Sequence, residues 1–392
     1  MLVQDYGAFA TAYSIYLFAL SVNQGLFYDP MNIVGSIYYD DQRRAYANSI
    51  VILQIAVSGI LSIAILLLGT LLYGSSNELG DAIFVLAVSL PFMNVLLILR
   101  RVAYLNTQPS ISLLGSLGYA ATLTIAFCFL RSLHRLNPST AIGLFGFSSG
   151  AVSVPIYFVL RSSLSNSSQG RVRLVLKEIA TRHWTLGRWL LGASVLAWMG
   201  TYLYVPLLGI IGRLQSAASL KALENLMLPM EQVLSVLGTL FIPIIAREYN
   251  TDRDSLSRNT NRLTKLVGVI TLGYSLLVSL GGRHMLVTLY GYQSSYALYY
   301  YVIPILTINL LLRVCSDFWI GIPLRINEKY DAFFKATIYS TVAMLGIGIL
   351  LVWRFDITGA AIAKVLPVVV QVIVLFHLFK RFAEESVKEV TS

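Results

Sequence analysis

The chain has 392 residues, of which 56% are hydrophobic and only 12% are charged, whereas about a quarter of the residues in a soluble globular domain are charged. The excess apolar surface must face lipid, and its long runs lack the period-2 alternation of barrel strands, so composition excludes a soluble domain and a transmembrane barrel. The net charge of +10 comes from short clusters of Lys and Arg between the apolar runs, a pattern typical of membrane topology and not of nucleic-acid binding.

The apolar runs predict an all-α polytopic membrane protein, because several of them reach the roughly 20 residues that a helix needs to cross the hydrocarbon core. We expect eleven transmembrane helices. In chain order they cover approximately residues 7–27, 46–73, 80–99, 111–130, 139–160, 187–211, 217–246, 264–281, 296–323, 333–353 and 358–379. The seventh and ninth are longer than a bilayer requires, and we expect Pro229 and Pro304 to kink or tilt them.

The basic residues predict the orientation of the helices. If the loop after the first helix is cytoplasmic, twenty-one of the 29 Lys and Arg residues lie on the cytoplasmic side, five lie in the opposite loops and three lie within helices. This distribution follows the positive-inside rule. It predicts a multi-pass protein of the inner (plasma) membrane with a cytoplasmic C-terminus.

The same topology places the N-terminus outside, so we expect a further helix upstream of Met1 and twelve spans in the complete protein. The longest polar stretch, 161–185, would then separate two six-helix lobes. The predicted organisation is an N-terminal lobe at 1–161 that lacks its first helix, a cytoplasmic linker at 162–186, a C-terminal lobe at 187–380 and a cytoplasmic tail at 381–392.

Four short motifs follow one another in an order that fits this helix count. They are Asp5-Tyr6-Gly7-Ala8-Phe9-Ala10, then Leu99-Arg100-Arg101-Val102-Ala103-Tyr104 followed by Gly115, Ser116 and Tyr119, then Trp184-Thr185-Leu186-Gly187-Arg188-Trp189, and Leu289-Tyr290-Gly291 followed by Tyr296. On these motifs, and over nearly its whole length, the chain resembles the bacterial polysaccharide flippases of the multidrug, oligosaccharidyl-lipid and polysaccharide (MOP) exporter superfamily. The first motif is similar to the family's external turn between its first two helices, which agrees with the expected upstream helix.

The resemblance implies a two-lobed helical bundle that alternates access and carries a polyprenyl-diphosphate-linked oligosaccharide from the cytoplasmic to the outer leaflet. Such a glycan would serve the synthesis of a surface polysaccharide, either lipopolysaccharide or exopolysaccharide. The implied driving force is a cation gradient or the supply of substrate. The implied partners are the lipid-linked oligosaccharide, membrane lipids, a polysaccharide polymerase and glycosyltransferases, with no nucleic acid and no cofactor.

Charged side chains at membrane depth are the candidate substrate-binding groups, because they are costly in lipid and mark substrate or ion pathways. The seventh predicted helix carries Lys221, Glu224 and Glu231 near one face. Lys221 and Glu224 could bind substrate or could neutralise each other one turn apart. Glu231 has no obvious partner in sequence, so it is a candidate for the coupling ion or for a hydrogen bond between helices.

Three further intramembrane charges lie in the ninth and eleventh predicted helices. Arg313 and Asp317 are four residues apart on the ninth, a spacing that allows either an internal ion pair or a binding patch in which Asp317 takes the coupling ion. Lys364 stands alone in the apolar run of the eleventh, and either binds substrate or extends to the outer surface. Arg suits a diphosphate by its bidentate geometry, and Lys by its compact charge.

Other polar groups have weaker claims to the site. Arg100 and Arg101 match a family motif, but a basic doublet at a helix end usually anchors topology. Side-chain amides could bind sugar hydroxyls or join helices in lipid; they are Asn23, Gln24, Gln54, Asn94 and Gln371. Tyrosines at an expected external turn could stack on sugar rings or form an interface belt; they are Tyr296, Tyr299, Tyr300 and Tyr301.

Three alternative functions remain open from the sequence. A membrane glycosyltransferase or glycan polymerase needs acidic loop residues for metal or base chemistry, but the expected external loops are short and nearly free of carboxylates, and no histidine belongs to a metal or catalytic group. We therefore expect no enzyme. A multidrug exporter of the same superfamily would need acidic residues inside the N-terminal lobe, where the first five helices have none away from their ends. A scaffold without transport activity is the third alternative.

Overall fold

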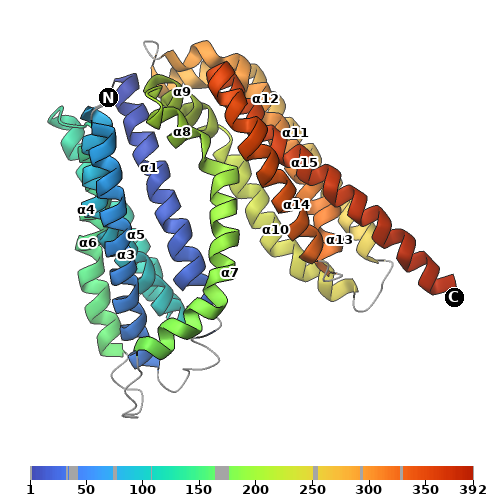
Figure 1. Cartoon of the computed structure of the whole chain (residues 1–392), viewed down its shortest axis with the longest axis horizontal. Coiled ribbons are helices and arrows are strands. Elements are labelled where there is room, and N and C mark those ends of the chain that lie inside the picture. Colours follow the sequence, from blue (N-terminus) through green and yellow to red (C-terminus); the bar gives the residue numbers. More distant parts are fainter. Residues whose placement is uncertain are drawn as a thin grey trace. The chain divides into compact units, whose positions relative to one another are not determined.

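The computed structural model of the protein describes residues 2–31, 34, 43–73, 77–106, 108–163, 176–249, 255–291, 295–326 and 330–391 (Figure 1). These residues form helices joined by turns, and no β-strand occurs among them. The predicted all-α fold class is confirmed. The chain divides into two compact units, Met1–Gln215 (unit 1) and Ser216–Ser392 (unit 2).

Unit 1 contains counterparts of the first six predicted helices. Its elements are α1 (Val3–Asn23), the π-helical turn η1 (Gln24–Tyr28), α3 (Arg43–Tyr73), α4 (Asn77–Leu105), α5 (Pro109–Ser132), α6 (Pro138–Ser163), α7 (Leu176–Tyr202) and α8 (Tyr204–Ile210). The start of α6 shows how the local sequence begins a helix. Asn137 Oδ1 accepts a hydrogen bond from the Thr140 backbone nitrogen (2.7 Å), and Thr140 Oγ1 accepts one from the Asn137 backbone nitrogen (2.9 Å). This reciprocal cap and Pro138 in the first turn begin α6.

Unit 2 contains counterparts of the other five predicted helices. Its elements are α9 (Leu214–Asn225, which begins in unit 1), α10 (Leu228–Tyr249), α11 (Ser255–Tyr290), the 3-10 helix η4 (Ser295–Val302), α12 (Ile303–Val314), the π-helical turn η5 (Cys315–Ile320), α13 (Gly321–Ile326), α14 (Tyr330–Ala343), the π-helical turn η6 (Met344–Gly348) and α15 (Ile349–Thr391). Within α15 a sharp kink at Asp356 (φ 52°, ψ −126°) falls at the predicted break between the tenth and eleventh helices.

The helix breaks predicted from proline are present in unit 2. The seventh predicted helix is divided into α9 and α10, and Pro229 is the second residue of α10, where a missing N–H costs nothing. The ninth changes from 3-10 to α-helix at Ile303, with Pro304 in the first turn of α12. Proline therefore begins the second part of each broken helix.

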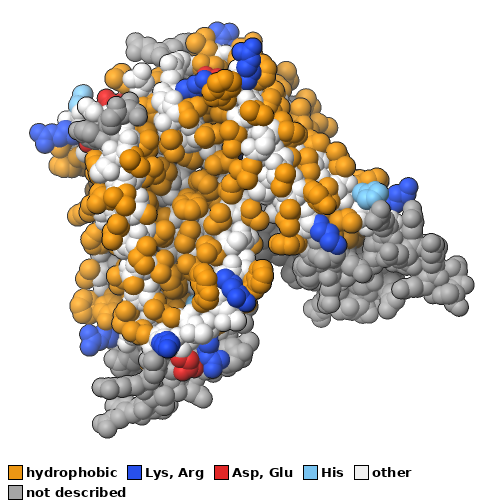
Figure 2. Space-filling model, viewed as in Figure 1, with side chains coloured by type: hydrophobic (Ala, Val, Ile, Leu, Met, Phe, Trp, Pro, Cys, Tyr) orange, Lys and Arg blue, Asp and Glu red, His pale blue; other side chains and the backbone are white. Residues whose placement is uncertain are grey.

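The surface of the described helices suits lipid. By length and apolar composition alone, seven helices of the described chain qualify to cross a membrane, or eight if α7 and α8, which meet at 69°, form one broken span. The uninterrupted α1 is not among them, α9 and α10 divide another predicted span, and α15 continues through its kink. On the face drawn in Figure 2, hydrophobic side chains cover most of the described surface, and charged ones lie mainly towards the helix ends.

Helix α7 begins at Leu176, inside the stretch 162–186 that the sequence predicts as a linker. Its first turns expose Glu178 and Arg182, which pair at 3.1 Å, and bury Ile179 and His183 on another face. His183 Nε2 lies 2.7 Å from the Tyr46 hydroxyl of α3, and its Nδ1 lies 3.1 Å from the Leu26 carbonyl oxygen of η1. Because α7 packs on α1 and η1, residues 187–215 group with unit 1, whereas the sequence predicts the second lobe to begin at 187.

Gly25 of η1 allows the closest approach to α7, and its replacement by alanine should destabilise unit 1. A Cβ at Gly25 would lie 2.5 Å from the Leu191 Cα and 2.6 Å from its nitrogen. Backbone atoms cannot move aside as a side chain can, so overpacking should cost about 1–3 kcal/mol. The midpoint of thermal unfolding in detergent should fall.

Gly192→Ala is the matched control, because a Cβ there meets nothing within 4 Å and alanine is the better helix former. Its unfolding midpoint should stay level or rise. Equal midpoints for Gly25→Ala and Gly192→Ala would show that the η1–α7 contact is not as close as described.

Candidate substrate-binding site

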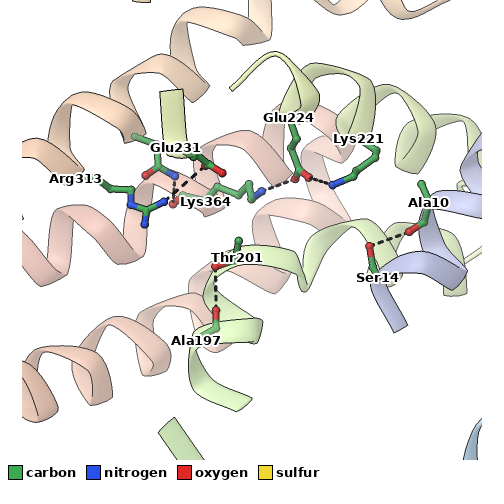
Figure 3. Close-up of polar contacts among 10 residues, drawn as sticks. Ala10, Ser14, Ala197, Thr201, Lys221, Glu224, Glu231, Arg313 and Lys364 are labelled. Carbon is green, nitrogen blue, oxygen red and sulfur yellow. Dashed lines mark hydrogen bonds and ion pairs between the residues drawn. The ribbon is translucent and has the colours of Figure 1, made fainter. Parts of the chain in front are cut away.

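Two lysines from different helices share one buried carboxylate in unit 2. Lys221 Nζ lies 3.6 Å from Glu224 Oε2 on the same helix, α9. Lys364 Nζ, on α15, donates a short hydrogen bond to Glu224 Oε1. Figure 3 shows the two lysines reaching Glu224 from opposite sides. We call these three residues the lysine cluster.

The lysine cluster is buried because every residue of α9 from Ser216 to Glu224 is buried. The side chains of Lys221, Glu224 and Lys364 are only 9–11% exposed. Residues on every side of α9 are fully buried, namely Ala217, Ala218, Leu220, Ala222 and Leu223. Removing a charge from water costs several kcal/mol, which pairing must offset. Each member of the cluster therefore depends on its partners.

A second charged group forms around Arg313 at the end of α12. Its Nη1 lies 3.7 Å from Glu231 Oε1 in the first turn of α10, and its Nε lies 3.7 Å from Asp317 Oδ2 in η5. These side chains are 30–41% exposed, so they are more accessible than the lysine cluster. Two carboxylates thus share one guanidinium, the reverse of the arrangement at Glu224. We call these residues the arginine cluster.

Asn309 joins the helices that carry the two clusters. Its Nδ2, one turn before Arg313 on α12, donates a hydrogen bond of 3.3 Å to the Lys364 carbonyl oxygen of α15. The two helices pack along this contact. Sequence reasoning missed Asn309, although an amide inside an apolar run is a signal for helix joining.

The predicted arginines of α4 lie in unit 1 and not with these clusters. The Arg101 guanidinium lies 5.8 Å from the ring centre of Tyr28, a cation–π distance. Arg100 is half-buried, and its Nε has no hydrogen-bond partner among the described residues. Arg101 is thus held by packing, whereas Arg100 retains a donor for another group.

The buried amides of unit 1 mainly join helices. Gln54 Nε2 donates to the Tyr28 hydroxyl and to the Asn94 carbonyl oxygen, both at 3.1 Å. Asn94 Nδ2 donates to Ser58 Oγ at 2.9 Å, and Asn23 Nδ2 donates within its own helix. These bonds connect η1, α3 and α4, as expected for polar residues that hold helices together in lipid.

The predicted external tyrosines differ in exposure. Tyr296 is buried and packs edge-on against Tyr290 with ring centres 5.0 Å apart. Tyr300 and Tyr301 are exposed, and the Tyr301 hydroxyl lies 3.3 Å from Thr358 Oγ1.

Among the described residues no group of three or more His, Cys, Asp or Glu side chains is placed to hold a metal ion.

Comparison with known proteins identifies the fold. No family model matches the chain, and no curated protein matches its sequence. Solved structures do match: an inward-facing multidrug resistance MATE transporter of the MOP superfamily is 13% identical and has a TM-score of 0.65, over 100% of this chain and 97% of that chain. The chain has the fold of the MOP-superfamily transporters.

Other solved structures with this fold include transporters of different cargo. The lipid II flippase MurJ, in an inward closed conformation, is 14% identical with a TM-score of 0.61, over 96% of this chain and 86% of that chain. The eukaryotic MATE transporter AtDTX14 is 16% identical with a TM-score of 0.60, over 99% and 88%. Multidrug transporters and a lipid flippase therefore share the fold, so the cargo must be argued from the site.

Proposed function

We propose that the chain is a transporter that moves a polyprenyl-diphosphate-linked oligosaccharide from the cytoplasmic to the outer leaflet of the inner membrane by alternating access. The observation that supports this most is the convergence of Lys221 and Lys364 on Glu224 in the buried interior of unit 2. Ammonium groups bind phosphate as compact charges. A diphosphate entering the lysine cluster would take the place of Glu224 as the counter-anion.

The arginine cluster supplies the proposed coupling groups. Glu231 and Asp317 share Arg313 and are more exposed than Glu224. A proton or a metal cation that binds one of these carboxylates would weaken its pairing with Arg313. We propose that this change in pairing favours one of the two access states, since a ligand shifts an equilibrium when it prefers one state.

A multidrug exporter is the alternative function on the same fold. A cationic drug calls for acidic groups inside the helices that bind it. Among the described residues of unit 1, the acidic residues lie in the first two turns of helices or just after η1; they are Asp5, Asp29, Glu78, Asp81 and Glu178. This distribution favours an anionic cargo, and with it a place beside glycosyltransferases and a polysaccharide polymerase.

Deleting the gene in its host should trap lipid-linked oligosaccharide on the cytoplasmic leaflet and reduce surface polysaccharide. The measurement is the fraction of lipid-linked glycan that an externally added glycosidase can digest in spheroplasts. Complementation with the wild-type chain and with Lys265→Met, an exposed lysine of α11, should restore that fraction. Normal glycan export together with increased sensitivity to cationic drugs would favour the multidrug exporter.

A further inference from the structure

Four aromatic side chains form a continuous stripe along α1. Tyr6, Phe9, Tyr13 and Tyr16 follow at intervals of three, four and three residues, so they lie on one face of the helix. Their successive ring centres are 6.1, 5.9 and 5.7 Å apart. The stripe extends about 15 Å along the helix. A tyrosine belt at the membrane interface occupies one depth, so a stripe of this length is not explained as a belt.

Small side chains of α1 make its closest contacts with neighbouring helices. Ala8, Ala12 and Ala19 are fully buried in the apolar core that α1 forms with α4. On another face the Ser14 carbonyl oxygen accepts a hydrogen bond of 3.1 Å from Trp198 Nε1 of α7. Tyr16 belongs to the same core, and Phe9 and Tyr13 pack at its edge, where they stay only half-buried.

Aromatic side chains of α5 and α6 complete the stripe. Phe145 of α6 stacks on Phe9 at 6.1 Å and packs on Tyr13 at 5.8 Å, and Phe127 of α5 packs edge-on against Phe145 at 6.0 Å. Tyr119 of α5 lies near Tyr13. All of these rings except the buried Tyr16 are half-buried, so they keep accessible surface. We call the rings from the three helices the aromatic strip.

Polar groups with unused hydrogen-bonding capacity flank the aromatic strip. Ser112 lies on α5 seven residues before Tyr119, and Ser148 lies on α6 three residues after Phe145, so each shares a helix face with a ring of the strip. Both hydroxyls are buried, and neither has a hydrogen-bond partner among the described residues. Beside them the Tyr119 hydroxyl is hydrogen-bonded with Ser149.

Arg100 lies at the Tyr16 end of the aromatic strip. It lies near both Tyr16 and Tyr119. Its Cγ passes within 3.8 Å of the position that a Cβ would occupy at Gly115 of α5, which brings the arginine close to that helix. Its buried Nε is the donor without a partner noted above. Burying a donor without a partner is unfavourable, so a ligand that accepts a hydrogen bond there is favoured.

Another side of α5 carries exposed apolar side chains instead of polar groups. Leu113, Leu117 and Ile125 are more than half exposed and form a mainly apolar face suited to lipid. Ser112 and Tyr119 lie on another side of the helix, and α5 packs on α4 and α6. Rings with a few convergent polar groups are typical of small-molecule sites, and a lipid-facing surface does not need them.

We propose that the aromatic strip binds the sugar rings of a glycan. The apolar C–H faces of the sugars stack on Tyr13, Tyr16 and Tyr119, Ser112 and Ser148 exchange hydrogen bonds with sugar hydroxyls, and Arg100 donates to sugar oxygens at the inner end. The proposal deepens the proposed function, and rests on it, because it assigns a place in unit 1 to the oligosaccharide of the cargo.

Photo-crosslinking in living cells tests the proposal directly. The full chain carries p-benzoylphenylalanine in place of Tyr13, and the control carries it in place of Leu117 on the lipid face of α5. The probe is the host's own lipid-linked glycan, with metabolically labelled prenyl and sugar parts. Irradiation should give an adduct containing sugar at position 13 and none at position 117.

The possible adducts separate this proposal from the proposed function. A sugar adduct without prenyl label would support the aromatic strip but contradict a lipid-linked cargo. Glycan export at the wild-type level with no sugar adduct at position 13 would overturn the aromatic strip and leave the flippase standing. Equal sugar adducts at positions 13 and 117 would also overturn it.

Substitutions add a readout that a merely structural role would not produce. Tyr13→Phe keeps the ring and should keep export, whereas Tyr13→Leu should lower export about tenfold, the effect of losing roughly one aromatic contact. Tyr104→Leu, at an exposed tyrosine of α4, is the matched control and should leave export unchanged. Unfolding midpoints of the three variants should agree within error. Loss of export in Tyr13→Phe, or none in Tyr13→Leu, would contradict stacking.

Discussion

Replacing Glu224 with glutamine should destabilise the protein more than replacing either of the lysines that it contacts. Glutamine has nearly the same shape but removes the carboxylate that Lys221 and Lys364 share. Breaking a buried ion pair by removing one partner costs about 3–5 kcal/mol, because the other charge stays buried. Here two charges lose one partner at once. The free energy of unfolding, measured by denaturant titration in detergent micelles, should fall by about that amount.

Lys364→Met distinguishes this account from a general sensitivity of α9 and α15. It leaves Glu224 paired with Lys221 at 3.6 Å, so it should cost less than Glu224→Gln. Glu178→Gln removes an exposed carboxylate that pairs with Arg182, and should change stability by less than about 1 kcal/mol. If Lys364→Met is as destabilising as Glu224→Gln, Glu224 is not the shared partner that the structure describes.

Lys364→Met should nevertheless impair transport strongly. In the proposed mechanism Lys364 donates a hydrogen bond to the diphosphate during transport. A hydrogen bond to a charged group contributes about 1.5–3 kcal/mol, which corresponds to a roughly 10- to 100-fold change in rate. The measurement is the initial rate of glycan translocation at equal amounts of folded protein. Lys364→Arg keeps a cation and should restore part of the rate.

Lys265→Met is the matched control for charge, since it removes an exposed lysine of α11 from the same unit. Its translocation rate should equal that of the wild type. A normal rate in Lys364→Met would show that the lysine cluster is structural and does not bind the cargo. A normal rate in both Lys221→Met and Lys364→Met would remove the main support for an anionic cargo.

Much of the fold follows from local properties of the sequence. Apolar run length predicts all eleven helical segments, because crossing hydrocarbon requires a run of nearly fixed length. Proline predicts where α10 and α12 begin, because it lacks an N–H and suits a first turn. The early start of α7 at Leu176 was not foreseen, because its polar first turns are stabilised by the buried contacts of His183 with Tyr46 and Leu26.

Side-chain pairing was predictable only within one helix. Spacing of three or four residues indicates the Lys221–Glu224 and Arg313–Asp317 contacts. Lys364 has no partner in its own apolar run, and Glu224 lies 140 residues before it. A contact between α9 and α15 cannot be predicted from periodicity, so the sequence left two interpretations of Lys364 open.

The aromatic strip was also beyond the reach of the sequence. The intervals between Tyr6 and Tyr16 show that the rings of α1 share a face, but they do not show what the face meets. That depends on Phe145 of α6 and on Tyr119 of α5, more than a hundred residues away in the chain. Arg100 could be read as a topology anchor until its unpaired Nε beside these rings was located.

Translocation in reconstituted vesicles tests the central claim most directly. The purified chain is placed in proteoliposomes that contain a fluorescent polyprenyl-diphosphate-linked oligosaccharide, and an added glycosidase measures how fast the inner-leaflet glycan becomes accessible outside. We predict translocation that depends on the protein, falls in Lys364→Met and is unchanged in Lys265→Met. Vesicles that leave the glycan in place while the same protein transports a cationic drug would contradict the account.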